Sequence, residues 1–137
     1  MEFYGEVVFS IADEKPIVVD FGEEVLPTKI VNKGKLVALG RRAPKNKWNY
    51  EIEYNGETEF LESLEKLLAV LCKRKDYISQ LTQLYEEVSI NAYIRSDWGQ
   101  ISYSLPSKLM KELASLDCAV NFDVLSYGMV RVEKTEE

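Results

Sequence analysis

Hydrophobic and polar residues alternate in several stretches of this chain, and a period of two predicts β-strands with one apolar face. Outside the region from 89 to 106, three stretches have this alternation. The second of them ends at the turn dipeptide Asn55-Gly56. Their apolar positions are Val7, Phe9 and Ile11, then Trp48, Tyr50, Ile52 and Tyr54, and finally Val120, Phe122 and Val124. We therefore expect strands there.

The region from Ser89 to Pro106 has the pattern of a β-hairpin. Two alternating runs flank Ser96-Asp97-Trp98-Gly99, and Asp97 and Gly99 are typical of a turn. The apolar positions are Val88, Ile90, Ala92 and Ile94 in the first run, and Ile101, Tyr103 and Leu105 in the second. Trp98 is not needed for a turn, so its indole either packs over the edge of the core or anchors a contact. We favour packing.

Apolar residues at helical spacing predict three helices. The first has Thr58 as its N-cap, and Asp76 caps the second. Pro106 opens the third. Their inward positions are Phe60, Leu61, Leu64, Leu67, Leu68 and Leu71, then Tyr77, Ile78, Leu81, Leu84 and Tyr85, and then Leu109, Met110, Leu113 and Leu116. The stretch from Ile17 to Leu39 is interpreted as a short irregular helix leading to a strand.

This order of elements predicts an α+β fold with two layers, in which helices pack on one face of a largely antiparallel sheet. A chain of 137 residues fits one domain, which we place at residues 1–132, with a frayed acidic tail at 133–137. No apolar run approaches a membrane span, and the N-terminus lacks a basic start. We expect a cytoplasmic protein with no membrane partner.

Charge is distributed unevenly along the chain, whose net charge is -6. Between Glu24 and Glu51 there is no acidic residue, and seven basic residues fall in this basic segment. They are Lys29, Lys33, Lys35, Arg41, Arg42, Lys45 and Lys47. We interpret the segment as a solvated loop rather than an anion contact, and expect no nucleic acid partner, because aromatic residues do not interleave with the cations.

Few residues suggest chemistry. The chain has no histidine, and Cys72 and Cys118 lack the spacing of a metal or redox motif, so we expect no metal, no cofactor and no catalytic residue of the common kinds. What remains is the polar face of the predicted sheet, where neighbouring carboxylates can act as acid and base but are more often only solvated. The candidate partner-binding residues are Glu51, Glu53, Asn91, Tyr93, Arg95, Asp97, Trp98 and Asp123.

Five features together resemble a bacterial family catalogued as domain of unknown function 4279. They are an early alternating strand (EVVFSIA), the stretch LPTKIVNKGKL, the aromatic strand KWNYEIEY, the paired helices, and FDVLSYGM near the end. The resemblance spans nearly the whole chain. It implies a small intracellular α+β domain without an assigned activity, and some members look like candidates for immunity proteins in bacterial toxin systems.

Two hypotheses follow for function. In the first, the protein is a non-enzymatic module of an immunity-like or regulatory kind that binds another protein, or a second copy of itself, through its polar sheet face. In the second, it binds a small molecule or acts as a minor enzyme through Glu51, Glu53 and Asp123, which requires these carboxylates to converge in a concave pocket. We favour the first, and expect no enzyme.

Overall fold

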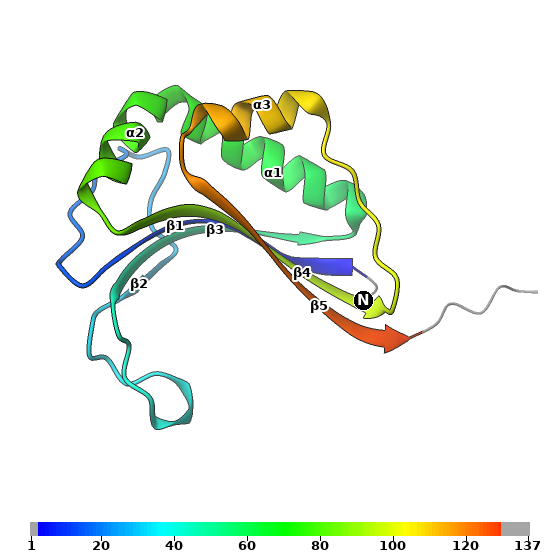
Figure 1. Ribbon diagram of the computed structural model, residues 1–137, viewed down its shortest axis with the longest axis horizontal. Coiled ribbons are helices and arrows are strands. Elements are labelled where there is room, and N and C mark those ends of the chain that lie inside the picture. The colour runs from blue at the N-terminus through cyan, green and yellow to red at the C-terminus, as the bar shows by residue number, and fades with distance from the viewer. Residues whose placement is uncertain (1–2, 130–137) are drawn as a thin grey trace, which may run out of the picture.

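A computed structural model describes residues 3–129 as a five-stranded sheet in the order β2-β3-β1-β4-β5, with helices on one side only (Figure 1). The strands are β1 (Phe3–Asp13), β2 (Lys29–Val31), β3 (Asn46–Asn55), β4 (Glu87–Trp98) and β5 (Ala119–Met129). The helices are α1 (Glu57–Leu71), α2 (Lys75–Leu84) and α3 (Ser107–Ser115), with short 3₁₀ turns at Ala38–Gly40 and Cys72–Arg74. The predicted α+β fold with two layers is confirmed.

The central strand is β1, which pairs antiparallel with both β3 and β4. Its alternation places Val7, Phe9 and Ile11 under the helices, where all three are fully buried. The same period puts Glu6 and Ser10 on the other face of the sheet, which no helix within residues 3–129 covers. We call this uncovered side the open face. It follows that the strand pattern correctly predicted which face is apolar.

The core lies between the sheet and α1, whose apolar stripe of Phe60, Leu64, Leu67, Leu68 and Leu71 is buried. Because these residues recur every three or four positions, they form one face of the helix. In the part of the chain that the structure describes, no helix is long and apolar enough to cross a membrane. The predicted tail at 133–137 and the domain end at 132 lie outside the described residues.

The predicted hairpin between 89 and 106 is wrong. Its first run is β4, but residues 99–106 form no strand, and β4 instead pairs in parallel with β5. Parallel neighbours require a crossover, which runs from the end of β4 up to α3 (Figure 1). Ile101, Tyr103 and Leu105 alternate because one side of this extended connection packs on the core. Trp98 is therefore half-buried at the end of a strand, not at a hairpin tip.

The predicted irregular helix after Ile17 is also wrong, since residues 14–28 contain no helix. This segment is irregular, and side chains next to both ends of α2 take up its backbone polar groups. The N–H of Val18 donates to Tyr85 Oη at 2.9 Å, and Arg74 Nη1 donates to the carbonyl of Phe21 at 3.1 Å. These tertiary hydrogen bonds outweigh the local preference of the segment for a helix.

The helix starts differ from the predicted caps. Gly56 is the N-cap of α1, so Thr58 already lies inside the helix. A 3₁₀ turn joins α1 directly to α2, which places Asp76 in the first turn of α2 and not at its cap. In α3, Leu109 and Leu113 are buried as predicted, whereas Met110 is half exposed, because it lies beyond the width of the buried stripe.

Candidate functional site

The open face is mostly polar, and strand register determines which side chains meet there. Glu6 on β1 is directly opposite Glu53 on β3 and Tyr93 on β4, while Val8 is opposite Glu51 and Asn91. Residues opposite each other in adjacent strands point to the same face, about 5 Å apart. Three glutamates from two strands therefore share the centre of this face.

The environment of Glu6 shows how closely these carboxylates interact. Burial raises the pKa of the Glu6 carboxyl, and the charges of Glu51 and Glu53 raise it further. Arg95 and Lys29 oppose this rise in pKa. The alternation in β1 shows which face Glu6 lies on. Its central position could not be inferred from the sequence, because nothing local places β1 between β3 and β4.

On the far side of β1, four of the predicted site residues form a polar ladder across β4 and β5. Arg95 Nη1 lies 3.9 Å from Asp123 Oδ1, and the guanidinium stacks over the Tyr93 ring at 5.7 Å. Two residues earlier on each strand, Asn121 Nδ2 donates to Asn91 Oδ1 at 2.9 Å. These residues are brought together as the sequence indicated. Because the partners lie on a half-exposed surface, the ladder orders side chains more than it stabilises the fold.

The other two candidates, Asp97 and Trp98, lie at the end of β4 rather than beside the carboxylates. Here the strand pairing shifts register, and Ser126 Oγ donates to the carbonyl of Trp98 at 2.6 Å. Both side chains are half-buried. The Trp98 side chain does not project from the surface. That its indole packs over the edge of the core, instead of anchoring a contact, stays a prediction.

The basic segment contains a projecting loop, which we call the basic arm and define as residues 32–45. It is a small hairpin: the Gly34 N–H donates to the Ala43 carbonyl at 2.8 Å and the Val37 N–H to the Arg41 carbonyl at 2.7 Å. At its apex, Leu39 is 92% exposed and has a φ of 62°, which is unusual for leucine. Figure 1 shows the arm on the side of the sheet opposite the helices.

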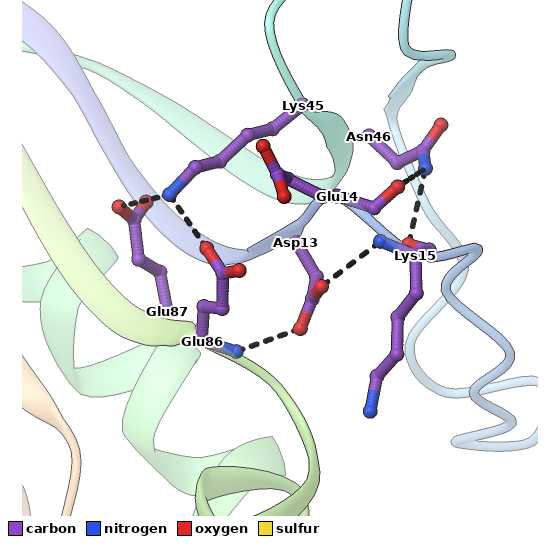
Figure 2. A network of polar contacts seen from close by, with 7 residues as sticks. All are labelled: Asp13, Glu14, Lys15, Lys45, Asn46, Glu86 and Glu87. Atoms are coloured by element: carbon purple, nitrogen blue, oxygen red, sulfur yellow. Dashed lines mark hydrogen bonds and ion pairs between the residues drawn. The ribbon is translucent and has the colours of Figure 1, made fainter.

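A network of polar contacts holds the base of the basic arm (Figure 2). Lys45 Nζ pairs with Glu86 at 2.8 Å and Glu87 at 3.1 Å, which attaches the arm to the start of β4. Hydrogen bonds to both glutamates raise the pKa of Lys45. Asn46 Nδ2 donates to the carbonyls of Glu14 at 3.2 Å and Lys15 at 3.0 Å, which attaches the arm to the end of β1.

Beneath this network, Asp13 secures the ends of β1 and β4. Its carboxylate accepts hydrogen bonds from the backbone N–H groups of Lys15 at 2.9 Å and Glu86 at 2.8 Å (Figure 2). These bonds favour the ionised form and hold the pKa of Asp13 below its usual value. The arm is therefore attached to a rigid corner of the sheet, although its sequence looks like an ordinary solvated loop.

Two hollows lie on or beside the open face. The first, of about 380 Å³, is bounded by the basic arm and contains charges of both signs. Its polar lining is Glu6, Lys29, Lys47, Asn49, Glu51 and Tyr93. The second, of about 430 Å³, lies by Gly5 and includes Glu6, Glu53 and Glu59. We call the first the arm hollow.

The carboxylates that the sequence suggested as an acid and base cluster do not converge in one pocket. Glu51 lines the arm hollow and Glu53 the other, while Asp123 lines neither and pairs with Arg95 on the far strands. Among residues 3–129, no group of three or more cysteine, aspartate and glutamate side chains is placed to hold a metal ion. What the open face offers is an ordered array of charges.

Replacing Glu6 with glutamine is expected to stabilise the protein at neutral pH by about 0.5 kcal/mol, a small value because solvent screens this half-exposed face. A raised pKa means that the folded state disfavours the ionised carboxylate, so its cost appears above the unfolded pKa of about 4.3 and is absent below it. Urea denaturation at pH 7 and at pH 3.5 measures the effect. Glu62→Gln, on the exposed side of α1, is the control, and an equal gain there or a gain that persists at pH 3.5 contradicts the interpretation.

Comparison with known proteins gives one finding. The family model described as "Domain of unknown function (DUF4279)" matches residues 2–127. No curated protein and no solved structure matches the chain.

Proposed function

The chain belongs to the DUF4279 family, whose description assigns no function, and we propose from its own surface that it is a non-enzymatic module that binds another protein through the open face. One observation carries this proposal: among residues 3–129, helices cover only one side of a five-stranded sheet, and the other side presents ordered charges beside a basic arm that is held at its base. A face of this kind suits docking of a complementary surface.

The chemistry of the partner follows from the arrangement of charge. Glu6, Glu51 and Glu53 form an acidic centre, whose mutual repulsion is relieved when a cationic group binds among them. The basic arm favours acidic groups at the margin of the same contact. We propose a partner with a basic protrusion surrounded by acidic residues, and a role of the immunity-like or regulatory kind in a bacterial cytoplasm, since control by contact needs no catalytic group.

The test is to purify the tagged protein from its native host at near-physiological salt and to identify by mass spectrometry what co-elutes in stoichiometric amounts. The variant Glu51→Lys with Glu53→Lys is expected to weaken binding of that partner at least about tenfold, because like charges then face the partner's cations. The matched control, Glu62→Lys with Glu65→Lys, makes the same change in net charge on the exposed side of α1 and leaves affinity unchanged.

Either of two results contradicts this proposal: both double variants weaken binding equally, or neither does. An equal loss means that net charge, and not the open face, attracts the partner. No effect means that the partner contacts another surface. Circular dichroism of each variant checks that the fold is intact.

A second candidate function has its own support in the arm hollow. Its volume of about 380 Å³ falls within the range of small-molecule sites, and Lys29 and Lys47 lie near Glu6 and Glu51. Such a site suits a small zwitterion, and the raised pKa of Glu6 makes this carboxyl a candidate proton donor. Native mass spectrometry distinguishes this alternative: a bound small mass that is lost in Glu51→Gln supports it, and a protein partner without such a mass contradicts it.

A further inference from the structure

The outer edge of the sheet at β5 is long and exposed. β5 has 11 residues, about twice the usual strand length, and among residues 3–129 only β4 is paired with it. Every second N–H and C=O of an edge strand points away from its neighbour and is available to another strand. The edge of β5 is therefore a template for further strand pairing.

β5 also has few of the features by which proteins protect such edges. Those features are short length, lysine, proline, inward charges and bulges, and the one register shift of β5 lies at its end, between Ser126 and Met129. From Ala119 to Met129 there is no lysine or proline, and Asp123 is the only charged residue. Phe122, Val124, Leu125 and Tyr127 are between 42% and 56% exposed, with apolar residues on both faces of the strand. The opposite edge, β2, has only three residues and carries Lys29.

We propose that two copies of this chain pair β5 with β5 in antiparallel orientation, which joins their sheets into one continuous sheet. A two-fold axis needs only one self-complementary edge, and an antiparallel pair of identical strands satisfies that condition. The proposal goes beyond the protein-binding function of the open face, because it uses the strand edge.

Charge and face pattern select the register. With the axis at Val124, Asp123 is opposite the partner's Leu125, so the one charge on the strand meets no like charge. Leu125 is aligned with Arg95 of β4, which places the partner's Asp123 on the same face as this cation. Phe122 is opposite the partner's Ser126, also on one face. The dimer keeps the two open faces on the same side of the joined sheet.

The test measures the mass of the full-length protein by light scattering after gel filtration, from about 1 μM to about 100 μM. We expect a dimer. Two variants of Leu125 then test the register, because the side chain is half exposed and faces the partner's Asp123. Leu125→Glu creates two like-charge pairs across the axis and is expected to raise the Kd for dimerisation about tenfold or more. Leu125→Lys creates two opposite-charge pairs and keeps Kd within about threefold of the wild type.

The contrast between these variants excludes misfolding as the cause. Within one chain, Leu125→Glu places its carboxylate beside Arg95, so the folded monomer is favoured by the same change that breaks the dimer. A wild-type protein that stays monomeric at about 100 μM overturns the proposal. It is also overturned when the dimer forms but the two variants change Kd equally, because the strands then do not meet in this register.

Discussion

Replacing Gly5 with alanine is expected to destabilise the protein by about 3 kcal/mol or more. Gly5 lies inside β1, and a Cβ there falls 1.9 Å from the carbonyl oxygen of Tyr93 on the adjacent strand. The backbone φ of 152° adds strain for any other residue. Since both obstacles belong to main chain in the middle of the sheet, neither can move aside.

The absence of a side chain at Gly5 also leaves room for a hydrogen bond across β1, between the strands on either side of it. Across this gap, Tyr54 Oη on β3 donates a hydrogen bond of 2.7 Å to the carbonyl of Tyr93 on β4. Burial raises the pKa of Tyr54, so its hydroxyl stays protonated and able to donate. The bond links the two strands that flank β1 beside Glu6. Gly5→Ala is therefore expected to disorder the acidic centre as well as to lower stability.

Urea denaturation followed by circular dichroism measures the loss. Gly34→Ala is the matched control, because Gly34 has a φ of 87° but no atom within 4 Å of an added Cβ. It isolates the backbone strain, about 1 kcal/mol, from the collision with Tyr93. If Gly5→Ala costs no more than Gly34→Ala, the close approach of β1 to β4 at this position is wrong.

Phe60→Ala is expected to cost about 3 to 5 kcal/mol. The Phe60 side chain on α1 is fully buried, and its ring lies 6.1 Å from that of Phe3, 5.1 Å from Tyr54 and 5.8 Å from Tyr103. These three rings belong to β1, β3 and the crossover to α3. Truncation therefore leaves a cavity where the helix, the sheet and the crossover meet, and rigid sheet neighbours limit how far it can collapse.

Chemical denaturation gives the size of this effect, and limited proteolysis gives its location. Because Tyr103 packs on Phe60, cleavage within residues 99–106 is expected to accelerate more than cleavage elsewhere. Phe122→Ala removes the same ring from a site that is 42% exposed and is expected to cost less than half as much. Equal losses for the two variants contradict the central place of Phe60 in the core.

Local patterns were sufficient for the elements that have one apolar face. β1, β3 and β4 follow their period of two, and α1 follows its stripe of buried leucines, because burial on one side imposes the same spacing wherever the element lies. The same patterns could not distinguish a strand from any extended segment with one buried side. Ile101, Tyr103 and Leu105 alternate as a strand does, yet they belong to the crossover.

In the candidate site too, local patterns predicted which residues share a face, but not which of them become neighbours. Asn91, Tyr93, Arg95 and Asp123 share a face, as strand periodicity predicted. Glu6 was missed, and the convergence of Glu51, Glu53 and Asp123 did not occur, because strand order and not strand period decides which carboxylates become neighbours. The basic arm has no local signal for its rigid attachment, which depends on Lys45 meeting glutamates from β4.

By itself, the sequence determined the fold class, the apolar faces of β1, β3, β4 and α1, and the family. These follow from the spacing of apolar residues and from motifs read along the chain. Only the tertiary structure decided the order of the strands, the parallel β5 edge and the meeting of the basic arm with the acidic centre. Such features depend on contacts between residues far apart in the chain, for which no local spacing exists.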